Sequence, residues 1–512
     1  MSRGLGDVYK SQGRMDAMAN ASPALYYLFA WLLAAIGYGY LMLFPILAGF
    51  AVAFVGYMVS QSSPLHWSST DWFIALAALC ISALAAWTTR AIALTRPDLP
   101  PGRPMTKADF PQLVNHINQL VAACNAPALE QIKLTTRFDI EIIRSPVHGF
   151  PSSFKHTLMI GLPVMSCMSA TQLKLLLARE IGHLAQCRRH YNRRIIYLRS
   201  VWQHYAQEYS HEWKPDTLLL RLFFCWYAPF YSLGTEAAVT LEEFIKDRCM
   251  LDITPVELAA EAIAVFEVKK RFIENEFWPE LNDMAYLQPR PSWLPYSSMD
   301  SRIAEKLDKE KARAYYNNET GQYSAADEER TLLHQRMKRL GQDEFIIPAH
   351  KPESAATHFF GNSLKLIQQQ MDNIWYLKNK AIWSRRYQQG INEKKQLKHL
   401  RDQAAKALLS NEEAHRYVLL LQKYLNPDQS RPLLHEILKT NSHDPQVCFD
   451  IGRLLLKAND GQGVDALNLA MEMSSGLTVE CCRQIVKYMI HSGDMNQAQI
   501  YRRKILTYQV AT

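Results

Sequence analysis

The residues most able to do chemistry stand at positions 179–183, which read Arg-Glu-Ile-Gly-His. With His at the first position, this would be a His-Glu-x-x-His pattern, in which two imidazoles on one helix face hold zinc and the Glu activates a metal-bound water. Here Glu180 stands at the position of the general base and His183 at that of the second ligand. Arg179 cannot be a ligand, because a guanidinium stays protonated and offers only donors. The sequence predicts a zinc-hydrolase helix whose metal site lacks one ligand.

The segment around this motif has the pattern of a buried helix. Ser169 and Gln172 form a Ser-x-x-Gln capping box at its start. Leucines at positions 173, 176, 177 and 184 fall mostly at helical spacing.

The third ligand of such a site must come from elsewhere in the chain. We expect it to be Glu243, in the segment LEEFIKDRC (241–249), with Asp247 one turn later orienting its neighbours. A buried carboxylate without a metal is costly, and a bidentate Arg–carboxylate pair relieves that cost. We therefore expect the Arg179 cation to stand in for the metal by pairing with Glu243 or Glu180.

The same residues also have simpler interpretations, and a different ligand set could in principle restore the metal. A Glu-x-x-x-Asp pair on a helix usually marks a solvated face, and a lone His is usually a satisfied polar residue. Cys187 and His190 share a helix face with His183. A metal held by His183 and Cys187 would lie one turn away from Glu180, and CRRHYNRR (187–194) reads more simply as a basic, solvated helix end.

Several segments between residues 70 and 400 carry a family resemblance. They are the Pro-rich stretch 96–113, the strand-like segment 134–146, the strand and motif helix 158–186, and the segments 223–232, 277–281, 331–341 and 354–361, with the Trp375–Trp383–Arg386 spacing. Together they resemble the HtpX-like and CAAX-prenyl-protease-like family of membrane-anchored zinc endopeptidases. The resemblance implies a zincin-like (gluzincin) fold, zinc as cofactor and polypeptide substrates.

The departures from the family pattern also fall at chemical positions. The family's His-Pro pair, whose His is thought to steady the reacting carbonyl oxygen, is replaced by Arg330 and Thr331. Its Asn-Ala pair is replaced by Asp139 and Ile140, and an Arg before the third ligand by Thr240. The positions that match are Glu180, His183, Glu243 and Asp247. This pattern puts zinc binding in doubt and favours a pseudopeptidase.

Three functions follow as hypotheses. The first is a membrane-anchored pseudopeptidase that binds polypeptide or membrane-protein partners. The second is an active zinc-dependent metalloendopeptidase, which the resemblance would place in membrane-protein quality control. The third is a membrane scaffold acting through its C-terminal helices.

Composition sets broad limits on the kind of protein. A chain of 512 residues is longer than a single domain usually is, so more than one domain is expected. Of these residues, 48% are hydrophobic, which is enough for a sizeable core. The net charge of +8 fits a protein beside an anionic membrane face better than a nucleic-acid binder, and no nucleic-acid module is evident. Nine scattered cysteines without a Cys-x-x-Cys pair indicate a reducing compartment.

Two apolar segments predict a membrane region. Residues 24–59 hold no charged side chain and exceed the roughly 20 residues of one span, so Gly37, Gly39 and Pro45 divide them into two short helices or one helix protrudes. Residues 72–89 predict a single span. We expect two spans, with three as the alternative.

Basic residues predict the orientation of these spans. The loop 60–71 has no Lys or Arg, whereas Arg90, Arg96, Arg103 and Lys107 follow the second span. The positive-inside rule then puts the large domain in the cytoplasm, and the resemblance implies a bacterial-type inner membrane. A shorter apolar run, 220–233, predicts a core or interfacial helix.

The chain is thus expected to be mainly α, with transmembrane helices, a zincin-like domain with a small β-sheet, and TPR-like helical repeats. The strand LMIGLPVM (158–165) is expected to form the edge of the cleft, and residues 304–330 a long helix followed by a loop. Segments 445–473 and 478–506 resemble two tetratricopeptide units, a weak periodicity. The expected regions are a cytoplasmic N-terminal tail (1–23), the membrane region (24–95), the peptidase-like domain (96–345), a helical connection (346–399) and the repeat domain (400–512).

Overall fold

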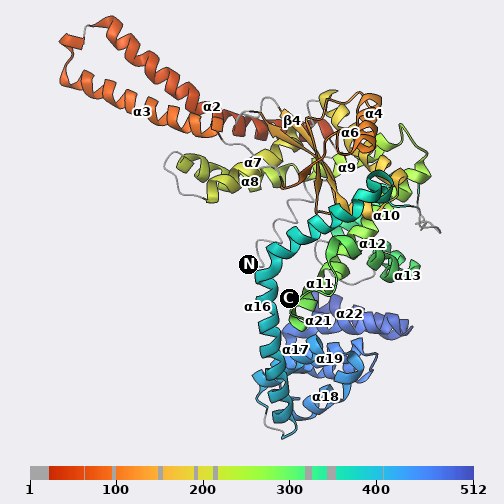
Figure 1. The fold of residues 1–512 in the computed structure, drawn as a ribbon. Helices are drawn as coiled ribbons and strands as arrows, with labels where there is room; N and C mark the ends of the chain where they lie inside the picture. The colour runs from red at the N-terminus through yellow and green to blue at the C-terminus, as the bar shows by residue number, and fades with distance from the viewer. Residues whose placement is uncertain are drawn as a thin grey trace. The chain divides into compact units, whose positions relative to one another are not determined.

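A computed structural model gives the fold and is shown in Figure 1. It describes residues 22–62, 64–94, 100–147, 154–189, 194–211, 217–317, 326–342, 353–406 and 409–511. The chain forms two compact units. Unit 1 comprises Met1–Pro279 and Trp293–Trp375, and unit 2 comprises Glu280–Ser292 and Tyr376–Thr512. The described part is mainly helical with a small mixed sheet, which confirms the fold class at that level.

The first apolar segment forms one continuous helix, α2 (Pro23–Gln61). It does not divide at Gly37, Gly39 or Pro45, so the two-helix alternative is wrong. It pairs with α3 (Ser69–Leu94), and the two form a long hairpin in Figure 1. By length and composition, both helices qualify as membrane spans, which weakly suggests membrane association.

The sheet has the order β1-β2-β4-β3. Its strands are β1 (Arg103–Pro104), β2 (Gln131–Thr135), β3 (Ile140–Pro146) and β4 (Phe154–Gly161). Strand β4 pairs in parallel with β2 and antiparallel with β3, so it lies inside the sheet. The expectation that residues 158–165 form the cleft edge is therefore wrong: the edge beside β4 is β3, and residues from Leu162 onward belong to helix α5 (Leu162–Cys167), where Pro163 favours a helix start.

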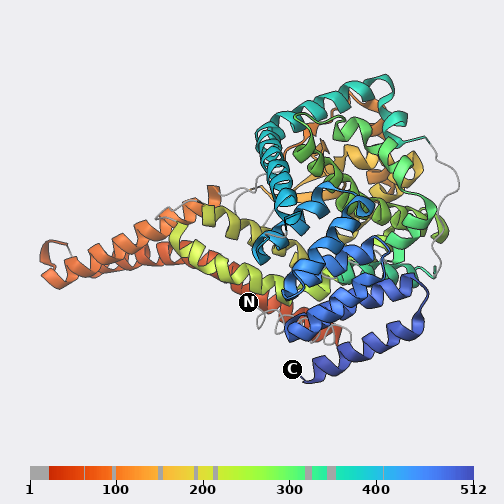
Figure 2. The same cartoon turned by 90° about the horizontal axis from the view of Figure 1, so that it is seen from below.

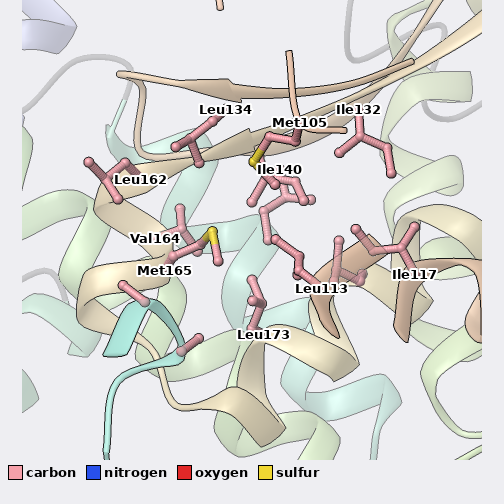
Figure 3. Packing of buried hydrophobic residues seen from close by; sticks show 14 of the residues in the cluster. Met105, Leu113, Ile117, Ile132, Leu134, Ile140, Leu162, Val164, Met165 and Leu173 are labelled. Atoms are coloured by element: carbon pink, nitrogen blue, oxygen red, sulfur yellow. The ribbon is translucent and has the colours of Figure 1, made fainter. Parts of the chain in front are cut away.

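The core of unit 1 lies between the sheet and its helices. Figure 3 shows Leu113 and Ile117 of α4 (Pro111–Ala123) facing Ile132 and Ile140 of the sheet. Leu173 of helix α6 (Ala170–Arg189) enters the same cluster. This packing fixes α6, and with it the motif, against the sheet.

The remaining helices of unit 1 follow α6 in the chain. They are α7 (Arg194–His211), α8 (Leu218–Gly234), α9 (Glu236–Met250), α10 (Val256–Phe272), α12 (Pro295–Lys306), α13 (Lys309–Asn317), α14 (Ala326–Arg339) and α15 (Ala355–Phe360). The long helix expected from residue 304 is interrupted, because Asp308 caps α13 by accepting the Lys311 N–H at 2.8 Å. Helices α11 (Trp278–Leu287) and α16 (Leu364–Ala404) run from unit 1 into unit 2.

Unit 2 contains six further helices in its described residues, drawn in blue in Figure 2. They are α17 (Asn411–Tyr424), α18 (Pro427–Thr440), α19 (Pro445–Lys457), α20 (Gln462–Met473), α21 (Thr478–His491) and α22 (Met495–Ala511). Two turns in this unit have the same backbone hydrogen bond, from the N–H of an Asp to the carbonyl oxygen five residues earlier. The Asp460 N–H donates to Leu455 O at 2.9 Å, and the Asp494 N–H donates to Met489 O at 2.8 Å. Both turns join packed helix pairs, α19 with α20 and α21 with α22.

Candidate functional site around Arg179

Arg179 is bound by three carboxylates. Its Nη1 donates to Glu180 Oε1 at 2.8 Å, its Nε donates to Asp247 Oδ1 at 2.9 Å, and its Nη2 donates to Glu243 Oε2. Helix α6 supplies Arg179 and Glu180, and α9, which packs on α6, supplies the other two carboxylates. The side chain of Arg179 is 13% exposed. The predicted pairing is confirmed for both Glu243 and Glu180.

Helix α6 has the start that its sequence predicts. The Ser169 N–H donates to Gln172 Oε1 and the Gln172 N–H donates to Ser169 Oγ, each at 3.1 Å. Gly182 lies against α9, because a Cβ there would stand 2.8 Å from the Cβ of Cys249. A small residue at this position lets the two helices approach closely enough for Arg179 to reach Glu243.

Lys246 brings a second cation to the same carboxylates. Its Nζ lies 3.1 Å from Glu243 Oε1 and 3.5 Å from Glu180 Oε2. Both oxygens of Glu180, the expected general base, therefore face a cation.

Arg336 of α14 adds a third cation. It donates to both oxygens of Asp247, at 2.7 and 2.9 Å, and its Nη1 donates to Glu267 of α10 at 3.0 Å. Asp247, which is 3% exposed in its side chain, thus connects Arg179 to Arg336. Asp247 was predicted to orient its neighbours, and in the structure its neighbours are the guanidinium groups of Arg179 and Arg336.

His183 is held by a neighbour of the expected third ligand. Its Nε2 lies within hydrogen-bond distance of Glu242 Oε1, and Glu242 is buried. Glu243 is turned toward Arg179 and Lys246 instead. The imidazole and the Glu243 carboxylate consequently interact with different partners.

The pKa shifts at this cluster follow from competition between burial and charge. Burial disfavours the charged form of Glu243, but Arg179 and Lys246 outweigh it and lower the pKa of this carboxyl group. Burial likewise opposes the charge of Arg179, yet Glu243, Asp247 and Glu180 raise its pKa. Burial opposes the charge of Lys246 too, and Glu180 and Glu243 raise its pKa. All three groups are therefore charged at neutral pH.

These residues do not fit a zinc ion. Zinc needs unprotonated donors converging on one point, whereas both carboxylates that would serve it are bound by cations. Within the described part of the chain, no group of three or more His, Cys, Asp or Glu side chains is arranged to hold a metal. The arrangement around Arg179 therefore supports no catalytic step through zinc.

Several residues singled out in the sequence fall outside the described part of the chain. His190 lies outside the described residues, and so do the side chains of Cys187, Thr240, Arg330 and Thr331. Asp139 and Ile140 are described: the Ile140 N–H donates to Asp139 Oδ1 at 2.8 Å, at the start of β3.

Sequence reasoning missed four members of the cluster. Glu242 and Lys246 lie in the same segment as Glu243, so their proximity was open to inference. Arg336 lies in the segment 331–341, which carries part of the family resemblance, but nothing in the sequence pairs it with Asp247. Glu267 carries no sequence signal.

A cavity of about 430 Å³ lies beside the start of β3. It is lined by the β2–β3 connection, residues 136–139, and by Lys270, Trp278, Tyr296 and Met299, among others.

Comparison of the chain with protein-family models, with curated proteins and with solved structures found no match.

Proposed function

We propose that this protein is a membrane-anchored pseudopeptidase that binds extended polypeptide without cleaving it. The observation that carries the proposal is the Arg179 guanidinium, which stands at the expected first-ligand position and is bound by Glu180, Glu243 and Asp247. A fixed cation there repels a dication and occupies the carboxylates that would bind it.

The position of Glu180 supports the loss of catalysis independently. A general base must reach the proton of an attacking water. The two oxygens of Glu180 are directed at Arg179 and Lys246, and each is bound by one of these cations. An attacking water would have neither a metal to lower its pKa nor a base free to receive its proton.

The edge strand supports polypeptide binding. The Gly161 N–H donates to Asp139 O at 2.9 Å, and Ile140 stands opposite Ile160. In an antiparallel ladder such pairs alternate between bonded and non-bonded. The N–H and C=O of Ile142 therefore point away from β4, toward the outer edge, where an extended peptide adds a strand.

Helices α2 and α3 support the membrane anchor. Both are apolar, and their large hydrophobic side chains are mostly exposed, as expected for contact with lipid. The absence of Lys and Arg from residues 60–71, and their presence from Arg90 onward, favours a cytoplasmic location for the rest of the chain.

Metal analysis of the full-length protein in detergent tests the proposal. We expect zinc well below one ion per chain and no cleavage of an unfolded protein such as casein when zinc is supplied. Stoichiometric zinc that disappears in His183→Ala, together with zinc-dependent cleavage, would establish the active-peptidase alternative instead.

The scaffold alternative has one observation in its favour. The matching turns at Asp460 and Asp494 are spaced 34 residues apart, which is the period of tetratricopeptide repeats. Gly452 of α19 lets α20 approach, because a Cβ there would stand 2.7 Å from Leu467 Cγ and 2.9 Å from Gly463 O. The variant Gly452→Leu separates the candidates: a scaffold loses its partners in this variant, whereas a pseudopeptidase retains polypeptide binding.

A further inference from the structure

The exposed positions of α8 are all apolar, and its one charged residue, Arg221, is half-buried. All side chains of this helix are described, and its exposed positions are Leu219, Leu222, Cys225, Trp226, Pro229, Phe230 and Leu233. None of them is charged, and Leu222 and Trp226 are 62% and 58% exposed. Soluble proteins rarely leave such a continuous apolar face uncovered.

The neighbouring helix α7 has the opposite surface. The exposed positions among its described side chains are Ser200, Gln203, Gln207, Glu208 and Ser210. The inner faces of the two helices meet through aromatic packing, with Trp202 of α7 stacked on Phe224 of α8 at 5.5 Å between ring centroids. The α7–α8 hairpin is therefore amphipathic as a unit, with one polar helix and one apolar helix.

The hairpin lies along the N-terminal half of α2. Tyr40 Oη donates to Leu219 O at 2.7 Å, and Tyr26 Oη donates to Gly234 O at 3.2 Å, so α8 runs antiparallel to α2 between these levels. The exposed positions of α2 in this half are also apolar, from Ala24 to Gly39. The surface of α8 thus adjoins the apolar surface that α2 and α3 share.

Helix α2 is too long for its two halves to cross one bilayer together. Its 39 residues extend about 58 Å, whereas the hydrocarbon core is about 30 Å thick. Helix α3 accompanies the C-terminal half, where Ser82 Oγ donates to Ala48 O at 3.2 Å. Pro45 lies between the halves and lacks an N–H, and the helix continues through it without interruption.

We propose that the α7–α8 hairpin is an interfacial membrane element. The exposed face of α8 lies in the boundary between headgroups and acyl chains of the leaflet next to unit 1, and the polar face of α7 points to water. The inference rests on the proposed anchoring by α2 and α3. Lipid is the fitting occupant because the face is apolar and aromatic, adjoins the spanning helices and belongs to an amphipathic unit.

Site-specific photo-crosslinking in the full-length chain tests the proposal. Phe230 of α8 is replaced by p-benzoylphenylalanine, and the protein is reconstituted in vesicles of phosphatidylethanolamine and phosphatidylglycerol and irradiated. Gln207 of α7 is the matched control, and Phe73 of α3, which is 73% exposed, is the positive control. Mass spectrometry then identifies lipid adducts on each peptide.

We expect lipid adducts at positions 230 and 73 and at least tenfold fewer at position 207. Adducts at position 73 without adducts at position 230, or cross-links from position 230 to a second protein, would overturn the interfacial role alone. Equal labelling at positions 207 and 230 would also overturn it, because both helices would then be immersed. Failure at position 73 would refute the membrane anchor itself, and the interfacial role with it.

Discussion

Arg179 forms ion pairs with three carboxylates, and the stability of this arrangement depends on all of them together. Taking a charge out of water costs several kcal/mol, which is recovered only where the partners are close and well oriented. The guanidinium supplies three donors in a fixed plane, and each one reaches a different carboxylate. No other single side chain can replace it in this geometry.

Removing this cation should destabilise unit 1. In Arg179→Ala, the carboxylates of Glu180, Glu243 and Asp247 lose a shared partner, and breaking a buried ion pair costs about 3–5 kcal/mol. We expect the melting temperature of the full-length protein to fall by about 10 °C. The control is Arg248→Ala on the exposed side of α9, which should change it little. An unchanged melting temperature in Arg179→Ala would show that the pairs contribute nothing.

The lowered pKa of Glu243 predicts a loss of stability in acid. The unfolded carboxyl titrates near pH 4.3, above the pKa of the folded one. The stabilisation is therefore complete above the unfolded pKa and declines as the pH falls toward the folded pKa, by about 1.4 kcal/mol for each unit of pKa shift. Melting temperatures at pH 7, 5, 4 and 3 should show the advantage of the wild type over Glu243→Gln shrinking below about pH 5. A constant difference would contradict the prediction.

Zinc binding should be recoverable by substituting both cations that face the carboxylates. Arg179→His supplies the missing imidazole, but Lys246 still lies 3.1 Å from Glu243. We expect the single variant to bind little zinc and the double variant Arg179→His/Lys246→Gln to bind about one ion per chain, measured by elemental analysis after dialysis. Adding His183→Ala should abolish the gain. A folded double variant without zinc would mean that His183 does not exchange Glu242 for a metal.

At the scale of elements, β3 and α6 define the surface that a polypeptide would meet. The backbone N–H and C=O of Ile142 point toward the outer edge of β3. Burial raises the pKa of the Glu141 carboxyl group on the same strand, and Asp139 and Glu180 add to this shift. Helix α6, which carries Arg179 and Glu180, packs against β3, so the edge strand lies beside the Arg179 cluster. A peptide added to β3 would therefore pass the position where an active enzyme cleaves.

A proline on β3 should block polypeptide binding and preserve the fold. In Ile142→Pro, the lost N–H points away from β4, which edge strands tolerate. We expect at least tenfold weaker binding of fluorescein-labelled, reduced and carboxymethylated α-lactalbumin, measured by anisotropy in detergent. Ile142→Val keeps the N–H and should bind like the wild type. Equal affinity for both variants would exclude strand addition at this edge.

Sequence patterns predicted the elements that are specified locally. The capping box fixed the start of α6, and apolar spacing identified its buried face. The prediction that residues 158–165 form an edge strand is wrong because an apolar run does not distinguish an interior strand from an edge strand. In addition, the strand ends at Gly161, and Pro163 lies in the first turn of α5. The alternative in which α2 is broken into two helices is wrong because an apolar helix tolerates Gly and Pro. Arg336 could not be paired, since only tertiary packing brings α14 to α9.

At the scale of the whole molecule, the chain enters unit 2 twice. Residues 280–292 join this unit from the middle of the chain, and residues 376–512 complete it. The two segments meet at Gly390, where a Cβ would stand 2.0 Å from the carbonyl oxygen of Tyr286. Backbone cannot yield as a flexible side chain does, so this contact requires glycine. Trp383 adds a second link, because its Nε1 donates to Gln288 O at 3.0 Å.

Gly390→Ala should therefore loosen unit 2 and leave the Arg179 cluster intact. We expect faster hydrogen exchange in residues 280–292 and 376–404 and a loss of about 1–3 kcal/mol from overpacking, with unchanged exchange in α6 and α9. Gly476→Ala is the matched control, since the nearest atom to its Cβ, Ser474 Oγ, is 3.9 Å away. If α6 and α9 lost protection to the same extent as unit 2, the two units would unfold as one, and binding at β3 would depend on the C-terminal helices.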